Sequence, residues 1–400
     1  MNAGEKVVRP SVGGIIGEED DPALAAVLGQ MGRPGSVDLV PTPALLCDLD
    51  LLDGNIEAMQ RTADAAGIAL RPHAKSHKSA SIARRQLDAG AVGICVAKLS
   101  EAEALVTAFE ADAGPRVSIL VTSPLAHLAA ARRAAALARR CDLSLVVDHP
   151  DGVAELSAAT DGGDPLTVLC DIDVGLGRTG VTGPDPALRI ATLVEAAPAL
   201  RFGGVQGYAG HAQHVAGRDL RRSSVDSAND RIAAVVDALE SAGHPVATRT
   251  GGGTGTGLLD IECGVLTELQ VGSYVFMDRE YRDALGTDPE AAFAQSLTLS
   301  TTVISTNQTG FVTVDAGLKS MATDAGVPTV IGHPDSRFAF FGDEQGLVTT
   351  SGSWSPGRGQ RLYLVPPHCD PTVDRHSRIW LTRDDRVVDV VAVTARGRSY

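Results

Sequence analysis

The chain has 400 residues, which is more than a single hydrophobic core usually supports, so two domains are expected, although one α/β barrel can take about 250 residues. Its composition, with 44% hydrophobic and 21% charged residues, is that of a globular protein. The net charge of −14 argues against nucleic acid or an anionic membrane surface as a partner.

The N-terminal segment, residues 1–40, is expected to be an extension of uncertain order. It lacks the apolar run of a signal peptide, and no later window approaches the 18 apolar residues of a membrane span. Six scattered cysteines without a C-x-x-C pair indicate reduced thiols, mostly buried, in a cytoplasmic protein. Residues 41–50 contain the strand-like TPALLCDLD, which we expect to pair with the C-terminal domain.

Residues 51–293 alternate short runs rich in Val, Ile and Leu with Ala-rich stretches of helical period. The apolar runs begin near Ile68, Val92, Val117, Leu143, Leu166, Gly204, Val246 and Leu269. Alternating strands and helices predict parallel pairing, and eight such units predict a closed (β/α)8 barrel of the TIM type. An open doubly wound sheet is the alternative, but no G-x-G-x-x-G follows the first strand.

Residues 294–400 have a different sequence pattern from the predicted barrel. Segments such as SLTLSTTVISTNQTGFVTVDAG and RIWLTRDDRVVDVVAVTARG alternate β-branched with polar residues and have no long helical period. This pattern predicts a mainly antiparallel β-domain after the barrel.

The stretch RPHAKSHKSA, residues 71–80, carries two lysines in a chain where 30 of 35 basic residues are arginine. Lysine is the residue required for Schiff-base chemistry, because its amine can lose a proton and attack a carbonyl carbon. Lys75 falls just past the first predicted barrel strand, where the active sites of such barrels lie. The alternative is that Lys75 and Lys78 are solvated charges on a loop.

Two glycine-rich segments follow the seventh and eighth predicted strands. In TRTGGGTGTG, Gly253 and Gly255 let the backbone approach an anion, and Thr254 adds a hydroxyl donor. In LQVGSYVFMD, Gly272 and Ser273 extend the same cradle. A phosphate cradle here, combined with a lysine after strand one, describes a pyridoxal phosphate site. A flexible glycine-rich turn is the alternative.

Other strand ends add candidate contacts. Arg178 follows the fifth strand and suits the phenolate oxygen of pyridoxal phosphate, whereas Tyr208 and His211 follow the sixth. A surface arginine, a packed tyrosine and a structural histidine are the alternatives. In VPPHCDPTVD, His368 and Asp370 would face the same side of an extended segment and share a divalent cation, while Cys369 faces away. A proline-bounded turn is the alternative there.

Several of these segments together resemble the D-threonine aldolase and D-serine dehydratase family, whose members are fold-type III pyridoxal phosphate enzymes akin in architecture to alanine racemase. The segments, in chain order from about Pro41, are TPALLCDLDLLDGNIEAMQ, RPHAKSHK, DVGLGRTG, GYAGH, GGGTGTG, QVGSYVFMD and PPHCDPT. The resemblance implies that Lys75 is the Schiff-base lysine and His211 an acid–base residue. It implies that the cofactor is held by Tyr208, Thr254, Gly272 and Ser273, and the metal by His368 and Asp370.

The metal motif divides this family, because the dehydratases have H-x-C and the D-threonine aldolases H-x-D. Asp370 stands in the third position here. The resemblance therefore implies an aldolase for D-β-hydroxy-α-amino acids that uses pyridoxal phosphate and Mn, Mg, Zn or Co. A D-serine or 3-hydroxyaspartate dehydratase is the alternative, followed by a racemase or a non-catalytic pyridoxal phosphate-binding protein. A head-to-tail homodimer is also implied.

Overall fold

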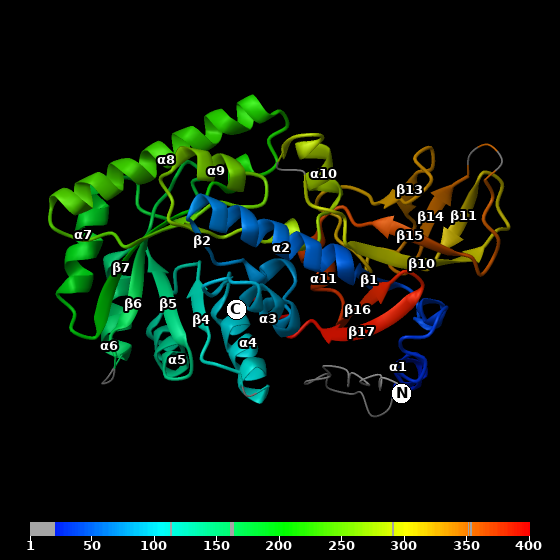
Figure 1. The fold of residues 1–400 in the computed structure, drawn as a ribbon, viewed down its shortest axis with the longest axis horizontal. Helices are drawn as coiled ribbons and strands as arrows, with labels where there is room; N and C mark the ends of the chain where they lie inside the picture. The colour runs from blue at the N-terminus through cyan, green and yellow to red at the C-terminus, as the bar shows by residue number, and fades with distance from the viewer. Residues whose placement is uncertain (1–20, 113, 161–163, 290–291, 351, 353) are drawn as a thin grey trace, which may run out of the picture.

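The computed structural model describes residues 21–400 apart from 113, 161–163, 290–291, 351 and 353, so residues 1–20 of the expected extension lie outside the described part. Figure 1 shows a curled parallel sheet surrounded by helices, and beside it a second sheet formed mainly by the C-terminal part of the chain. The long helix α2 (Leu49–Ala66) runs along the junction of the two.

The first sheet consists of eight parallel strands in the order β2-β9-β8-β7-β6-β5-β4-β3. These strands are β2 (Ala69–Leu70), β3 (Ile94–Val96), β4 (Ser118–Val121), β5 (Asp142–Val147), β6 (Leu166–Asp171), β7 (Leu200–Gly207), β8 (Thr248–Gly251) and β9 (Glu268–Leu269). A parallel bridge between His73 and Cys95 joins the two edges just beyond β2. The hydrogen bond from the Cys95 N–H to the Pro72 carbonyl, 2.8 Å, supports this closure into a barrel.

Helices cover the outside of the barrel (Figure 1). They are α2, α3 (Ala80–Asp88), α4 (Leu99–Ala111), α5 (Leu128–Ala138), α6 (Pro150–Ala159), α7 (Pro184–Glu195), α8 (Arg218–Ser241) and α9 (Gly257–Cys263). The last helix before the second sheet, α10 (Arg279–Leu285), lies toward that sheet, and the Arg279 N–H donates to the Pro366 carbonyl at 3.1 Å. Local sequence sets their ends: the Asp48 carboxylate caps α2 by accepting from the Leu51 N–H at 3.0 Å, and Gly67 ends it in the left-handed region at φ 66°.

Side chains alternate between the two faces of the barrel strands. Ile94, Ile119, Leu145 and Val168 belong to the main core under the helices. Their sequence neighbours Cys95, Leu120, Val146 and Leu169 form a separate buried cluster, which therefore lies inside the barrel. This apolar layer fills the interior on the β3 to β6 side, so the barrel is a packed core with its open end at the carboxyl ends of the strands.

The second sheet has nine strands, mostly antiparallel. They are β1 (Ala44–Asp48), β10 (Leu297–Ser305), β11 (Phe311–Val314), β12 (Thr329–Val330), β13 (Phe338–Phe340), β14 (Gly346–Thr349), β15 (Arg361–Val365), β16 (Arg378–Arg383) and β17 (Arg386–Ala392). The early strand β1 pairs antiparallel with β10 and parallel with β16. A short helix, α11 (Cys369–Val373), lies between β15 and β16.

The described residues before β1 pack on this second sheet. Helix α1 (Pro22–Leu28) and the 3-10 turn η2 (Ser36–Leu39) bury Leu24 and Val37 in a cluster with Trp380. The Asp21 carboxylate caps α1 and forms an ion pair with Arg378 at 3.0 Å. Residues 21–40 are thus part of the folded domain.

This architecture confirms the predicted barrel and β-domain. The six cysteines are free thiols, and all but Cys263 are buried, as expected. Within the described residues, no helix is both long and apolar enough to cross a membrane.

Candidate active site

The carboxyl ends of the barrel strands face α11 of the β-domain. The chain leaves β2, and His73 precedes a 3-10 turn, η3 (Ala74–Ser76), that carries Lys75. The turn packs against α11, which brings the amine of Lys75 into an ion pair with the carboxylate of Asp370. Two residues that are 295 positions apart in sequence therefore meet at one point.

The Asp370 carboxylate is held by several groups. Its Oδ2 accepts from the Lys75 ammonium, and its Oδ1 accepts from the Ser273 hydroxyl at 3.2 Å and lies 3.3 Å from the Cys369 thiol. Burial opposes ionisation of Asp370, but the charges of Lys75 and His368 and the hydrogen bonds from Lys75 and Cys369 together outweigh burial and hold the pKa of Asp370 well below its usual range. Burial also opposes the charge on Lys75, whose pKa is nevertheless raised by the same carboxylate.

The local conformation of the metal motif differs from the expected extended segment. His368 is extended, with φ −144° and ψ 122°, but it is the N-cap of α11, so Cys369 and Asp370 are helical. The buried Asp278 fixes this arrangement, because its carboxylate accepts from the Cys369 N–H at 2.8 Å and caps α10 at Tyr281 N, 2.9 Å. The Cys369 thiol consequently does not face away from Asp370, as the extended register predicted, but contacts it.

His368 has a carboxylate partner that the sequence did not suggest. Its Nδ1 lies 2.7 Å from Oδ2 of Asp324, a residue 44 positions earlier in the chain. Burial lowers the pKa of His368, but the Asp370 and Asp324 carboxylates together raise it above its ordinary value. With Nδ1 engaged, Nε2 is the nitrogen left to bind another group.

The two glycine-rich segments lie on adjacent loops after β8 and β9. The Tyr274 N–H donates to the Thr254 hydroxyl at 3.0 Å and so joins the loops. Gly253 and Gly255 pack tightly on Gln213, because an added Cβ would come within 2.4 Å of its side chain or 2.1 Å of its carbonyl oxygen. These glycines are thus required for the loop to lie against its neighbour.

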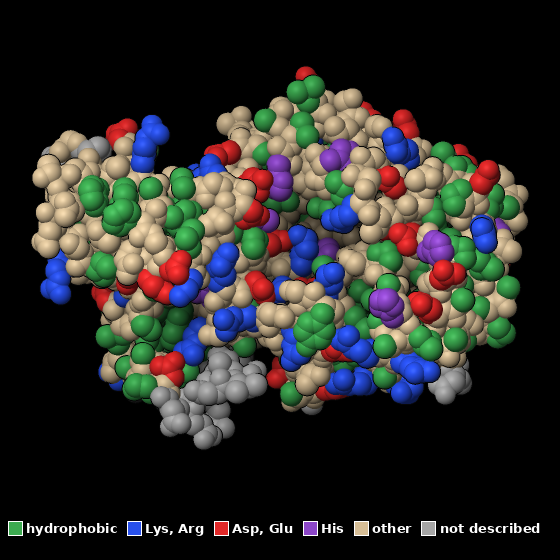
Figure 2. Space-filling model, turned by 180° about the vertical axis from the view of Figure 1, so that it is seen from behind, with side chains coloured by type: hydrophobic (Ala, Val, Ile, Leu, Met, Phe, Trp, Pro, Cys, Tyr) green, Lys and Arg blue, Asp and Glu red, His purple; other side chains and the backbone are tan. Residues whose placement is uncertain are grey.

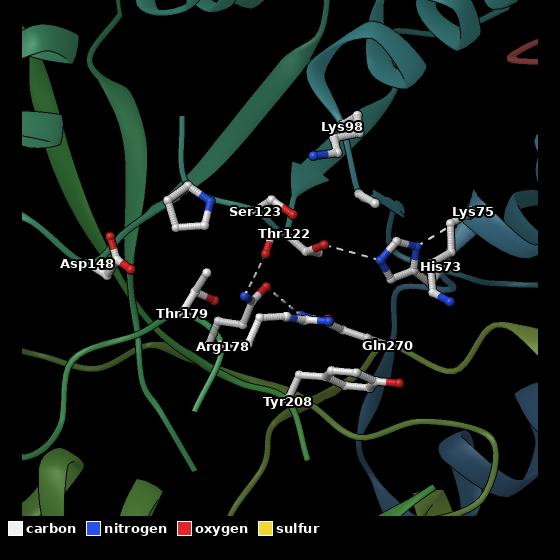
Figure 3. Close-up of a pocket in the computed structure, with 13 residues that line it drawn as sticks. His73, Lys75, Lys98, Thr122, Ser123, Asp148, Arg178, Thr179, Tyr208 and Gln270 are labelled. Carbon is white, nitrogen blue, oxygen red and sulfur yellow. Dashed lines mark hydrogen bonds between the residues drawn. The ribbon is translucent and has the colours of Figure 1, made fainter. Parts of the chain in front are cut away.

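A cavity of about 570 Å³ opens at this end of the barrel (Figure 3). It is lined by His73, Lys75, Ala97, Lys98, Thr122, Ser123, Pro124, Asp148, Arg178, Thr179, Gln206, Tyr208 and Gln270. Figure 2 shows a hollow near the middle of one face of the molecule, with lysine, arginine and histidine side chains around it. The size is typical of a small-molecule site.

Arg178 and Tyr208 line this cavity together, as their positions after β6 and β7 predicted. The Arg178 guanidinium lies 5.8 Å from the centre of the Tyr208 ring. Below them Gln206 and Gln270 form a buried floor, in which the Gln270 amide donates to the Gln206 carbonyl oxygen at 3.2 Å. Burial lowers the pKa of His73 to about 3, so that its ring is neutral beside Lys75.

The two histidines of the loop after β7, His211 and His214, differ in burial and in their contacts. His211 belongs to the 3-10 turn η4 (Gly210–Ala212), is exposed, and does not line the cavity. His214 is half-buried against Tyr281, with ring centres 4.4 Å apart, and its Nε2 has no partner among the described residues. Burial lowers the pKa of His214, whereas the Glu280 carboxylate, 3.6 Å from its Nδ1, opposes this effect. The charges of His368 and Asp370 also act on His214.

Asp324 and His214 are thus the residues that sequence reasoning missed. His214 lay within the quoted stretch QGYAGHAQH, but nothing in the local pattern distinguishes it from His211. Asp324 lies in a loop before β12 and carries no motif. Only the long-range packing of the β-domain on the barrel mouth identifies either residue.

Comparison with known proteins agrees with this geometry. A family profile described as "Alanine racemase, N-terminal domain" matches residues 47–280, and "Putative serine dehydratase domain" matches residues 296–382. A D-threonine aldolase from Arthrobacter sp is 39% identical over 90% of this chain and 94% of its own length. The chain belongs to the D-threonine aldolase and D-serine dehydratase family.

Two further family members are similar over nearly their whole length. The crystal structure of D-threonine aldolase from Filomicrobium marinum has a TM-score of 0.85 at 36% identity, covering 91% of this chain and 97% of that one. A 3-hydroxy-D-aspartate aldolase from Paracoccus denitrificans (strain Pd 1222) is 36% identical over 90% of this chain and 93% of its own length. The family predicted from the sequence is therefore confirmed.

Pyridoxal phosphate, the cofactor expected in this family, fits the donors that the two loops present. Within the described part of the chain, the backbone N–H groups of Thr254, Gly272 and Ser273 donate to no acceptor, although all three residues are buried. A bound phosphate would satisfy these groups, whose exclusion from water is otherwise costly. Lys75 lines the same cavity and presents a primary amine, the group to which this cofactor attaches.

The metal motif, His368 and Asp370, fits a divalent cation that keeps some coordination positions free for water or substrate. Among the described residues, no group of three His, Cys, Asp or Glu side chains is placed to hold a metal ion. His368 and Asp370 offer one imidazole nitrogen and one carboxylate, so water or substrate would complete the coordination. The Asp324 carboxylate on His368 Nδ1 is the partner that metal-binding histidines of proteins commonly have.

Proposed function

We propose that this protein is a pyridoxal phosphate- and divalent metal-dependent aldolase that cleaves D-threonine and related D-β-hydroxy-α-amino acids to glycine and an aldehyde. The observation that carries the proposal is the contact between Lys75 and Asp370. It brings the carboxylate of the proposed metal motif to the amine proposed to attach the cofactor. A substrate held at Lys75 would have its β-oxygen within the neighbourhood of His368 and Asp370.

The residues around this point have separate tasks. When bound, pyridoxal phosphate accepts the electron pair released from the Cα–Cβ bond. His368 and Asp370 would hold a divalent ion, which would supply Lewis acidity to the substrate β-hydroxyl. Thr254, Gly272 and Ser273 would hold the phosphate, and Arg178 and Tyr208 would hold the ring, so that the reacting carbon would stay at Lys75.

Cleavage also requires a base for the β-hydroxyl proton. The resemblance assigned this role to His211, but that side chain is exposed, whereas His214 is half-buried. Neither histidine lines the cavity itself. We therefore propose His214. Burial lowers its pKa below the usual value, so the imidazole is neutral near pH 7, and its Nε2 has no partner among the described residues to compete for the proton.

Substituting His214 with asparagine should reduce kcat for D-threonine on the order of 100-fold, the typical contribution of a general base. Since the lowered pKa of His214 keeps the base deprotonated down to acidic pH, the wild-type rate should fall only on the acidic side, and this limb should disappear in the variant. His211→Asn is the matched control, expected to keep both kcat and the pH profile. A large loss in His211→Asn with normal His214→Asn kinetics would return the role to His211.

A dehydratase remains the second candidate, because the same site could release hydroxide from the β-carbon. Asp370, where the dehydratases have cysteine, favours the aldolase. The products distinguish the two reactions: D-threonine gives glycine and acetaldehyde by cleavage, but 2-oxobutanoate and ammonia by elimination.

We further propose a cytoplasmic homodimer in which one subunit's β-domain covers the partner's barrel mouth. Light scattering that found a stable, active monomer would contradict this assembly.

A further inference from the structure

One wall of the cavity has no part in the chemistry assigned so far. In the closed barrel, the strand order places β4 and β5 opposite β8 and β9, and β3 between β4 and β2. The residues that follow these three strands and line the cavity include Lys98, Ser123 and Asp148. Figure 3 shows Lys98 and Ser123 together on one side of the cavity, with Tyr208 on the opposite side and Arg178 between.

Lys98 is a cation without an acidic partner. It is exposed, and among the described residues no carboxylate forms an ion pair with it. Its neighbour Glu101 is already engaged, because it accepts from the Ala97 and Lys98 N–H groups at 2.8 and 3.1 Å and lies 3.4 Å from the Lys78 ammonium. A free ammonium at a cavity edge attracts an anionic ligand, all the more in a chain of net charge −14.

The other polar groups on this wall do not prevent an anion from binding at Lys98. Asp148 is the one carboxylate in the cavity lining, and its Oδ2 accepts from the Gly180 N–H at 3.0 Å. The Ser123 hydroxyl has no hydrogen-bond partner within the described residues, and Ser123 lines the same cavity as Lys98. One ammonium and one free hydroxyl are together suited to a single carboxylate.

We infer that Lys98, aided by Ser123, binds the α-carboxylate of the amino acid substrate. This inference rests on the proposed function, which accounts for the other anionic and oxygen groups in the site. The cofactor phosphate belongs to the β8 and β9 loops, the β-oxygen to the metal motif beside Asp370, and Arg178 to the ring. The α-carboxylate is the substrate anion that remains, and it is common to every substrate and to glycine.

The test is substitution of Lys98 with methionine, which keeps the aliphatic stem and removes the charge. Glycine binding is followed by titrating the absorbance of the bound cofactor, so that neither cleavage nor the metal is involved. Loss of one charge-assisted hydrogen bond should weaken glycine binding and raise the KM for D-threonine by about 10- to 100-fold. Binding of methylamine, which has no carboxylate, should not change.

Two controls complete the experiment. Lys98→Arg should retain most glycine affinity, and Lys319→Met, which removes a surface lysine paired with Glu344 on the β-domain, should behave as the wild type. Unchanged glycine affinity in Lys98→Met, or equal loss for glycine and methylamine, would overturn the inference. So would a loss confined to 3-hydroxy-D-aspartate, since Lys98 would then bind a β-carboxylate. Because glycine is bound without being cleaved, a failure of the aldolase proposal would leave this result interpretable.

Discussion

Replacing Lys75 with alanine is expected to abolish essentially all turnover together with the visible absorbance of covalently held pyridoxal phosphate. Neither Lys78 nor Lys98 is placed to substitute for it, since Lys78 is buried and paired with Asp374 at 2.8 Å, and Lys98 follows a different strand, β3. The absorbance spectrum of the purified variant after incubation with the cofactor, and an assay with D-threonine, measure the two effects.

Lys78→Ala is the matched control for this experiment. Its loss leaves the carboxylates of Asp374 and Glu101 unpaired, so the free energy of unfolding should decrease by about 1–3 kcal/mol. The visible absorbance should nevertheless persist. If Lys78→Ala lost the absorbance while Lys75→Ala kept it, the assignment of the cofactor lysine would be wrong.

Replacing Asp370 with alanine should reduce cleavage of D-threonine on the order of 1,000-fold, because a metal-bound β-hydroxyl gains several kcal/mol of charge stabilisation. Glycine should still bind to the cofactor, because it has no β-oxygen to coordinate. Steady-state kinetics, metal content after dialysis and a glycine titration separate these effects. If the Asp370→Ala enzyme had normal metal content and normal kcat, His368 and Asp370 would form only a structural turn and not a metal site.

Cys369→Ser tests the position of the ligand within the motif. The thiol contacts Asp370 Oδ1 at 3.3 Å, and a serine hydroxyl can donate to the same oxygen, so metal binding and kcat should change little. Loss of metal in Cys369→Ser, with retention in Asp370→Ala, would make Cys369 the ligand and favour the dehydratase.

The barrel could be predicted because its signal is local. Each βα unit buries apolar residues with a fixed period, and seven of the eight predicted runs begin within about two residues of the observed strands. The exception is β7, which begins at Leu200 and not near Gly204, because the chain enters the sheet earlier along exposed residues such as Arg201. Helix α1 was missed because its stability comes from packing on β17, not from a strong periodic pattern.

The candidate site was predictable only in part for a related physical reason. Lys75 and the glycine-rich loops follow barrel strands, whose carboxyl ends must converge. The contacts of Asp370 with Lys75 and of Asp324 with His368 depend on how the β-domain docks, which no local pattern encodes. The α11 helix was missed because its five residues are too short for a helical period, and Asp278 supplies the tertiary hydrogen bond that holds its start.

The most direct measurement is product analysis of the holoenzyme with D-threonine, before and after metal removal by a chelator. We expect glycine and acetaldehyde in equal amounts, loss of both products when the metal is removed while the cofactor absorbance persists, and recovery of both when Mn²⁺ is added. Formation of 2-oxobutanoate and ammonia in place of glycine, or full cleavage activity after verified metal removal, would contradict this expectation.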